Sequence, residues 1–170
     1  MKIGLLSDTH GLVDDAIFHY LKECDEIWHA GDIGNPDVLD KLKSFKPLRA
    51  VYGNIDGHEI RQELKEVNFF TVEGLKILMM HIGGYPPHYN TSALKLLSET
   101  QPDIFICGHS HILRISRDQT RNNLLYLNPG ACGNHGFHIV RTLIRFTIES
   151  GTIKNPEVIE LYPRMISSKK

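Results

Sequence analysis

Five short apolar runs, each ending at a glycine or a polar cluster, constrain this sequence more than any other feature. They are four or five residues long and rich in Ile, Leu and Val, which is typical of buried central strands. Residues that can bind a metal follow every run. Because open α/β sheets form their ligand crevices beyond the carboxyl ends of strands, we expect these side chains to converge. The runs cover residues 2–6, 26–30, 48–52, 77–80 and 104–107, and the residues that follow them are Asp8, His10, Asp32, Asn54, His81, His109 and His111.

The segments between the early runs carry helix signals. Apolar residues recur at helical spacing over residues 13–21. Residues 36–42 begin with a proline directly after Asn35, a favourable N-cap, and a third helix is expected over residues 92–97, before Pro102. This alternation of strands and helices predicts an α/β fold.

The later part of the chain is mostly strand-like. Turn residues separate pairs of apolar segments and predict hairpins over residues 69–80 and 140–161, with one further strand over 124–128. No repeat, low-complexity tract or Gly/Ser linker interrupts the sequence. We therefore expect residues 1–170 to form a single domain with mixed sheets.

The spacing of the candidate ligands predicts how they are presented. Asp8 and His10 are two residues apart, as are His109 and His111, and on an extended chain both side chains of such a pair lie on one face. A glycine also precedes several ligands and would let the backbone turn tightly into a crowded site. The ligands preceded by glycine are Asp32, Asn54 and His109.

The donor atoms of these seven side chains are imidazole nitrogens and carboxylate or amide oxygens, with no thiolate. This mixture suits Mn, Fe, Ni, Co or Zn and argues against a structural zinc finger. Seven ligands are too many for one tetrahedral ion but suit two ions that share a carboxylate, the arrangement that clamps both oxygens of a phosphoryl displacement. A cap or a turn would explain any one of these residues alone, but not their joint occurrence.

Six motifs follow one another along the chain. They are Asp8-Thr9-His10, Gly31-Asp32, Gly53-Asn54-Ile55-Asp56, His81, Gly108-His109-Ser110-His111 and Asn128-Pro129-Gly130. Together they resemble the ordered motifs of the calcineurin-like metallophosphoesterases, and the chain length resembles the small single-domain phosphodiesterase branch of that superfamily. The resemblance implies an αββα sandwich, in which two mixed sheets pack together between helices, with a dinuclear metal site at the strand ends.

The same resemblance implies how the ligands divide between the two ions, with Asp32 bridging them. One ion would be held by Asp8, His10, Asp32 and His111, and the other by Asp32, Asn54, His81 and His109. The implied reaction is the hydrolysis of a small phosphodiester by a hydroxide that bridges the two divalent ions.

Charge supports a diester as the substrate class. The two ions, two carboxylates and the hydroxide leave a site of about +1, which attracts a singly charged phosphodiester. Asn54 is a neutral ligand that could also donate a hydrogen bond to a phosphate oxygen. The alternatives are a phosphomonoesterase or nuclease, and a non-catalytic metal-binding scaffold similar to the retromer subunit of this fold.

The sequence departs from the superfamily pattern beside the asparagine. Many members carry a histidine there, thought to protonate the leaving group, whereas this chain has Ile55. Asp56, His58 and His29 are nearby substitutes, and we assign Asn54, Asp56 and His58 to catalysis. The alternative is that no strong general acid exists, which would favour substrates with good leaving groups.

A second departure follows His81, where Gly83 replaces a further histidine of the family pattern. The loop over residues 84–90 then contains two prolines and two tyrosines. Such a loop can wall a substrate cleft and stack on a base or aryl group, although a plain surface connector is the alternative. We assign Tyr85 and His88 to substrate binding, with His88 either replacing the missing ligand or contacting the phosphate.

Composition sets the remaining expectations. The chain has 170 residues, and 19 Lys plus Arg balance 20 Asp plus Glu, which argues against an extended nucleic-acid surface. The three scattered cysteines favour a reducing, cytoplasmic compartment. No apolar run approaches the roughly 20 residues that span a bilayer, and a homo-oligomer is compatible with the sequence. His135 and His138 either rim the site or are ordinary loop residues, and the second is the expected role.

Overall fold

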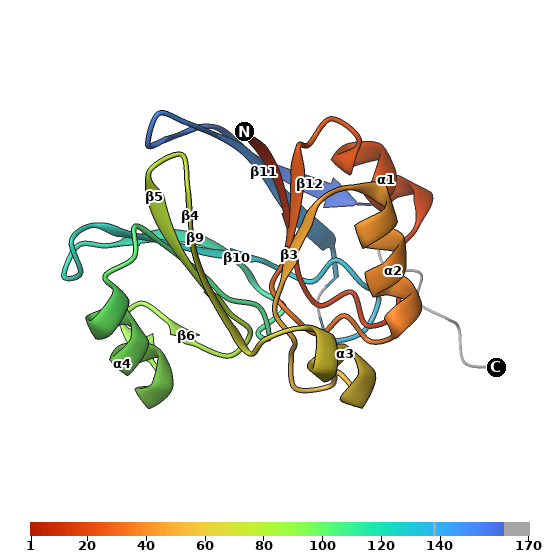
Figure 1. Cartoon of the computed structure of the whole chain (residues 1–170), viewed down its shortest axis with the longest axis horizontal. Coiled ribbons are helices and arrows are strands. Elements are labelled where there is room, and N and C mark those ends of the chain that lie inside the picture. Colours follow the sequence, from red (N-terminus) through yellow and green to blue (C-terminus); the bar gives the residue numbers. More distant parts are fainter. Residues whose placement is uncertain (138, 162–170) are drawn as a thin grey trace.

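The computed structural model describes residues 1–137 and 139–161, which form two five-stranded mixed sheets (Figure 1). The first sheet has the order β12-β11-β1-β2-β3 and the second the order β4-β5-β8-β10-β9. Within the first sheet β1, β2 and β3 are parallel, and within the second β5, β8 and β10 are parallel. The first sheet consists of β1 (Lys2–Leu6), β2 (Glu26–His29), β3 (Leu48–Ala50), β11 (Arg141–Glu149) and β12 (Thr152–Leu161). The second consists of β4 (Val67–Val72), β5 (Leu75–Met80), β8 (Ile104–Ile106), β9 (Leu113–Asp118) and β10 (Leu124–Pro129).

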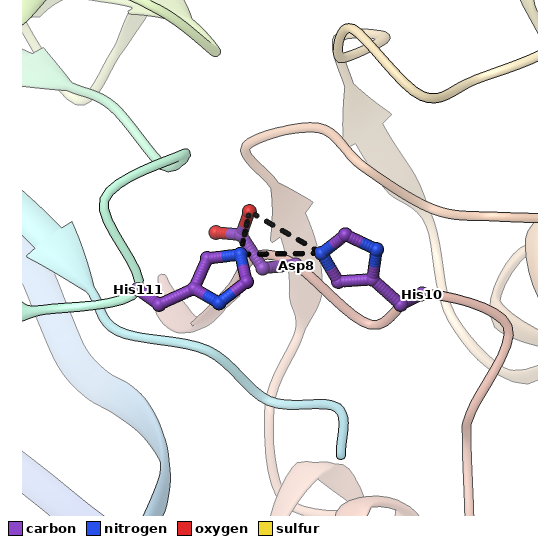
Figure 2. Close-up of side chains that lie close together, drawn as sticks. All are labelled: Asp8, His10 and His111. Atoms are coloured by element: carbon purple, nitrogen blue, oxygen red, sulfur yellow. Dashed lines mark hydrogen bonds and ion pairs between the residues drawn. The ribbon is translucent and has the colours of Figure 1, made fainter. Parts of the chain in front are cut away.

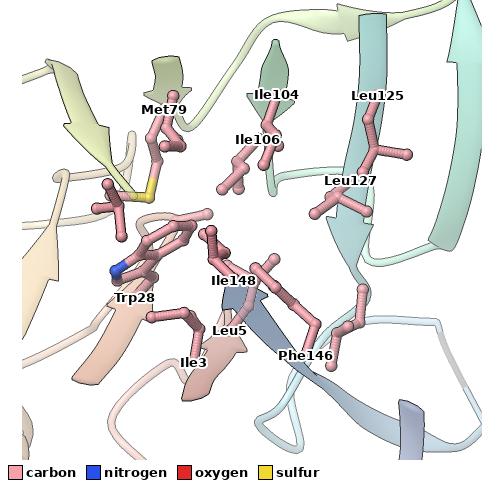
Figure 3. Packing of buried hydrophobic residues seen from close by; sticks show 14 of the residues in the cluster. Ile3, Leu5, Trp28, Met79, Ile104, Ile106, Leu125, Leu127, Phe146 and Ile148 are labelled. Carbon is pink, nitrogen blue, oxygen red and sulfur yellow. The ribbon is translucent and has the colours of Figure 1, made fainter. Parts of the chain in front are cut away.

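The two sheets pack face to face through one shared core (Figure 3). Alternate residues of a strand point to opposite faces, so Ile3 and Leu5 of β1 enter this core while Leu6 faces the other side of the sheet. Since both faces are covered, the strand reads as a continuous apolar run. The core includes Trp28 of the first sheet and Met79, Ile106 and Leu127 of the second.

Helices cover the outer face of each sheet. Helices α1 (Asp15–Leu21) and α2 (Pro36–Phe45) pack on the first sheet, where Ile17 and Leu39 join the same apolar cluster as Ile27. Helix α4 (Thr91–Thr100) covers the second sheet through Ala93 and Leu97. The structure thus confirms the expected αββα sandwich of two mixed sheets.

The predicted helices extend slightly differently from their sequence signals, and their caps explain where they begin. The side chain of Asp14 accepts a hydrogen bond from the backbone of Ile17, and Asn35 and Asn90 cap α2 and α4 in the same way. Four elements were not predicted: helix α3 (His58–Glu63), strand β9 and the short strands β6 (Gly84–Tyr85) and β7 (His88–Tyr89). Helix α3 has only six residues, and on the edge strand β9 the apolar side chains Leu113 and Ile115 face solvent. Helix α3 and strand β9 therefore lack the amphipathic pattern of apolar residues on a buried face by which sequence analysis recognises an element.

The hairpins agree with the predicted pairs. Strands β4 and β5 pair in antiparallel fashion, as do β11 and β12, and a short hairpin of β6 (Gly84–Tyr85) and β7 (His88–Tyr89) lies between β5 and α4. No helix among the described residues is both long and apolar enough to cross a bilayer.

Candidate metal centre

The first cluster of candidate ligands joins the loops that follow β1 and β8 (Figure 2). The Nε2 atom of His111 lies 3.2 Å from Asp8 Oδ1, and His10 Nε2 lies 3.9 Å from the same oxygen. The two imidazole Nε2 atoms are 3.2 Å apart. All three side chains therefore direct one donor atom to a common point.

The second cluster joins the loops that follow β2, β5 and β8. It contains Asp32, His81 and His109, whose donor atoms lie within 4.8 Å of one another. His81 Nε2 is 3.2 Å from Asp32 Oδ1, and the rings of His81 and His109 meet edge to face with centroids 5.3 Å apart.

Asp32 lies between the two clusters. Its Oδ1 atom faces His81 of the second cluster, and its Oδ2 atom lies 3.7 Å from His10 Nε2 of the first. Both Asp8 and Asp32 are almost fully buried, which is costly for carboxylates that lack a compensating positive charge. The arrangement offers one carboxylate oxygen to each cluster.

Hydrogen bonding at His81 tests whether a cation fits this site. Its Nδ1–H donates to the carbonyl of Ala30 at 2.8 Å, so its Nε2 carries a lone pair in the neutral ring. That Nε2 is buried and makes no hydrogen bond, although a carboxylate oxygen of Asp32 is 3.2 Å away. Two lone pairs repel at this distance unless a proton or a metal lies between them. The mixed nitrogen and oxygen donors suit a divalent transition ion.

The histidines of the site divide by their electrostatic surroundings. Burial lowers the pKa of His10 and of His109 despite the nearby carboxylates, which favours the neutral, metal-binding form. A hydrogen bond to Asp8 raises the pKa of His111. For His81, burial opposes the charge, but the adjacent Asp32 carboxylate and the charge of Asp8 outweigh it and raise the pKa.

The backbone of the ligand loops is not extended, which corrects the geometry expected from the i, i+2 spacing. Five ligands adopt the left-handed conformation, in which non-glycine residues cost of order 1–3 kcal/mol each. The adjoining loops hold one another in place, because the backbone N–H of Asp8 donates to Gly31 and that of His10 donates to Asp32, both at 3.0 Å. The five residues and their φ angles are Asp8 (55°), His10 (47°), Asp32 (56°), His109 (67°) and His111 (59°).

The glycines before the ligands act mainly by their small size. Only Gly31 needs a positive φ, of 96°, and a Cβ there would come within 2.7 Å of the His81 ring. A Cβ at Gly53 would collide with Asp32, and one at Gly108 with Ser7. At these last two positions close packing, rather than a positive φ, requires glycine.

Asn54 lies beside the second cluster. It is exposed and lines a cavity of about 240 Å³ together with His81, Ile82 and Arg61. Sequence analysis did not identify Arg61, which donates to the carbonyls of Asn54 (3.1 Å), Gly53 (3.0 Å) and Asp56 (2.6 Å). This arginine fixes the backbone that presents Asn54.

The structure corrects the catalytic role expected of Asp56. The side chain is buried, and its two oxygens accept hydrogen bonds from the backbone N–H groups of Gly34 and Gly53, each at 2.8 Å. It therefore anchors two loops and presents no free oxygen to a leaving group. His58 is an exposed residue at the first position of α3.

His29 is also excluded as the substitute acid, because it is completely buried behind the site. Its Nδ1 accepts from the Gly31 N–H at 3.2 Å, so its Nε2–H donates to Thr9 Oγ1 at 2.9 Å, and Thr9 in turn donates to the carbonyl of Ile33. Burial lowers the pKa of His29 to about 4. This network joins the loop of the first cluster to that of the second.

Tyr85 and His88 lie on the β6–β7 hairpin, with their rings 5.5 Å apart. Both line a cavity of about 480 Å³ that His109 also lines. Among the described residues His88 belongs to neither ligand cluster. Gly83 is explained by packing, because a Cβ there would lie 2.5 Å from the Phe105 ring.

One loop histidine lies closer to the site than expected. The ring of His135 is 4.9 Å from that of His10, so this exposed residue rims the first cluster. Its only sequence signal was its position after Asn128-Pro129-Gly130. His138 lies outside the described residues.

The ordered sequence motifs, the two-sheet sandwich and the two ligand clusters are all consistent with one protein family. A sequence comparison establishes which family it is. The calcineurin-like phosphoesterase superfamily domain matches residues 1–151. The chain belongs to this superfamily. A probable metallophosphoesterase of Methanothermobacter thermautotrophicus is 32% identical to this calcineurin-like chain in an alignment of length 137 that covers 77% of each protein. A phosphodiesterase of Methanocaldococcus jannaschii is 28% identical in an alignment of length 148 that covers 78% of this chain and 84% of that protein.

Solved structures agree on the calcineurin-like fold. An archaeal phosphodiesterase superposes with a TM-score of 0.74 at 22% identity, covering 95% of this chain and all of the other. Vps29 from Entamoeba histolytica, solved as a complex with zinc, superposes with a TM-score of 0.72 at 19% identity, covering 94% of this chain and 99% of the other. At these identities the likeness establishes the fold alone, and it covers an enzyme as well as Vps29.

Proposed function

We propose that this calcineurin-like protein is a metal-dependent phosphodiesterase whose seven ligand residues hold two divalent ions. The observation that carries the proposal is the position of Asp32, which offers Oδ1 to the His81 cluster and Oδ2 to the His10 cluster. A carboxylate placed in this way suits a bridging ligand. The ligands are Asp8, His10, Asp32, Asn54, His81, His109 and His111.

Two such ions would acidify a water to form the nucleophile and would neutralise charge on the phosphate oxygens. The protein's own groups then position the substrate. Asn54 contributes no charge, and its amide can donate to a phosphate oxygen while Arg61 fixes its backbone. The Ala30 carbonyl holds His81 in the tautomer that keeps its Nε2 free. Tyr85 and His88 line the cavity beside His109, where a substituent of the ester would lie.

Protonation of the leaving group falls to His58 in this proposal. Ile55 cannot transfer a proton, and Asp56 and His29 are buried in hydrogen-bond networks. His58 is exposed and follows the Asn54 loop directly. If His58 does not act, the protein hydrolyses only esters with good leaving groups.

The likeness to Vps29 favours a second candidate, a binding scaffold without catalysis. Three observations support the enzyme instead: the buried carboxylates, the five strained ligand residues and the unbonded Nε2 of His81 are costly features that a scaffold does not require. The balanced charge of the chain disfavours a nuclease with a long nucleic-acid track. The three free, buried cysteines suit a reducing compartment such as the cytoplasm.

The proposal is tested by stripping the protein of metal and adding back Mn, Fe, Co, Ni, Zn or Mg singly, with bis-p-nitrophenyl phosphate and p-nitrophenyl phosphate as substrates. We expect turnover with at least one transition ion and a preference for the diester. Asp32→Asn should abolish it, whereas Asp40→Asn, the same chemical change at an exposed residue of α2, should not. A metal-loaded protein without turnover would instead be a scaffold, and a preference for the monoester would assign it to the phosphomonoesterases.

A further inference from the structure

The cavity between the β6–β7 hairpin and His109 has an unusual lining for a phosphoesterase substrate site. Its walls include Tyr85, Tyr89 and Tyr126 together with Ile82, and among the described residues that line it none is Asp, Glu, Lys or Arg. Its volume of about 480 Å³ is typical of pockets that enclose small organic groups. The cavity therefore suits an uncharged substituent and offers a charged one no carboxylate, ammonium or guanidinium partner among the described residues.

The hairpin that walls this cavity is braced from two sides. The Tyr126 hydroxyl donates to the Gly84 carbonyl at 2.9 Å, and the side-chain amide of Asn90 donates to the Ile82 carbonyl at 2.8 Å. The first bond holds the hairpin against β10 of the second sheet, and the second joins the residues that precede and follow the hairpin. The wall is thus formed before a ligand arrives, which lowers the entropy lost on binding.

Arg114 of β9 holds the Tyr85 ring. Its guanidinium lies 4.4 Å from the ring centroid, and its Nη2 donates to the Pro86 carbonyl at 3.1 Å. The arginine is half-buried, yet Tyr85 keeps 41% of its surface exposed. The Tyr85 ring is therefore held in place by a cation and is still accessible to a ligand. Planar groups stack on such a ring without needing hydrogen bonds to it, so the ring can serve as a stacking platform.

We infer that this hydrolase acts on phosphodiesters that carry a planar aromatic substituent, a nucleobase or an aryl ring, which stacks on Tyr85 in this cavity. The inference rests on the proposed function, since the cavity opens beside His109 of the second cluster. Tyr85 contacts the substituent, and Arg114 is a positioning residue that acts through Tyr85.

The test uses isothermal titration of the Mn-loaded protein with three singly charged esters: phenyl, cyclohexyl and thymidine methylphosphonate. Phenyl and cyclohexyl have the same number of ring carbons, but only phenyl is planar. We expect the phenyl and thymidine esters to bind about tenfold more tightly than the cyclohexyl ester, which is the effect of one stacked ring. Tighter binding of thymidine than of phenyl points to a nucleotide substrate, and the reverse order points to a simple aryl ester.

The variants separate stacking from general damage. The quantity compared is the affinity for the phenyl ester divided by the affinity for the cyclohexyl ester. Tyr85→Leu should bring this ratio close to one, Tyr85→Phe should retain it, and Arg114→Ala should reduce it about threefold. The control is Arg117→Ala on the same strand, because the Arg117 guanidinium donates to the carbonyl of Asn123, whereas that of Arg114 contacts the hairpin at Tyr85 and Pro86. A wild-type ratio below about twofold, a full ratio in Tyr85→Leu, or no binding of any ester overturns the inference. Stacking without turnover of bis-p-nitrophenyl phosphate would instead contradict the proposed activity.

Discussion

The carboxylate of Asp32 and the neutral imidazole of His81 face each other as two hydrogen-bond acceptors. His81 Nε2 lies 3.2 Å from Asp32 Oδ1, and the only ring proton of the neutral histidine is donated to Ala30 on the opposite side. Two acceptors remain stable at this distance when a cation lies between them. This pair therefore links the hydrogen bonding of the loops to the capacity of the site to bind metal.

Metal should stabilise the folded protein measurably. A ligand that binds only the native state adds about 2.7 kcal/mol to the free energy of unfolding when its concentration is one hundred times its dissociation constant. We expect the Tm to rise when Mn is added to the EDTA-treated protein, and we expect Asp32→Asn to lose most of this rise. Differential scanning calorimetry measures it, with Asp40→Asn as the exposed control. An equal rise in both variants would show that the stabilising ion binds elsewhere.

His29 predicts how the metal-free protein responds to acid. Burial lowers its pKa from about 6.5 to about 4, so between these values the unfolded chain binds a proton that the folded chain does not. The free energy of unfolding is therefore unaffected by His29 above about pH 6.5. It falls by up to ~3 kcal/mol as the pH falls toward 4, because protonation of His29 favours the unfolded chain. Chemical denaturation of wild type and His29→Gln across pH 4–7 should show a smaller loss of stability in the variant.

The control for this experiment is His19→Gln, because His19 is an exposed residue of α1. It should follow the wild-type curve. The prediction is contradicted if His29→Gln loses as much stability between pH 6.5 and 4 as the wild type does.

Arg61 should matter for catalysis through the backbone of Asn54. The Nε and Nη2 atoms of the planar guanidinium reach the three carbonyls from separate positions, which the single nitrogen of lysine does not reproduce, so Arg61→Lys keeps the charge but loosens the loop. We expect kcat for bis-p-nitrophenyl phosphate to fall at least tenfold, the scale of a misplaced catalytic group, with a small change in KM. Steady-state kinetics on the Mn-loaded protein measure both constants. A drop in Arg61→Ala that Arg61→Lys fully restores would mean that only the charge is needed.

His58 should affect substrates according to their leaving group. General acid catalysis is worth roughly 10²–10⁴-fold, and alkoxides need it far more than p-nitrophenolate. We expect His58→Ala to slow an alkyl phosphodiester at least a hundredfold and bis-p-nitrophenyl phosphate only a few-fold. Equal rates of wild type and variant on the alkyl ester would remove His58 from the mechanism.

Much of the fold could be predicted because one rule governs it. Strands such as β1 are buried on both faces, so they read as continuous apolar runs, and their ends carry the ligands. The convergence of Asp8 and His10 with Asp32 follows from this rule together with the parallel pairing of β1 with β2. Capped helices were equally visible, because Asn35 and Pro36 mark the start of α2 in the sequence itself.

Other features depend on contacts between distant segments and left no local signal. The left-handed backbone at Asp8 and His10 is maintained by carbonyls of another loop, which spacing alone does not reveal. Asp56 resembled a catalytic carboxylate in the sequence, but its partners are backbone N–H groups brought in by the fold. Arg61 was missed for the same reason, since its three acceptors are backbone carbonyls, which every sequence contains.

The central claim is a site of two metal ions joined at Asp32, and a stoichiometric titration tests it most directly. Mn is added in steps to the metal-free protein at a concentration far above the dissociation constant, and turnover of bis-p-nitrophenyl phosphate is measured at each step. The proposed site predicts little activity up to one equivalent and a rise that levels off at two equivalents per chain. Full activity at one equivalent, or no activity at any ratio, would contradict it.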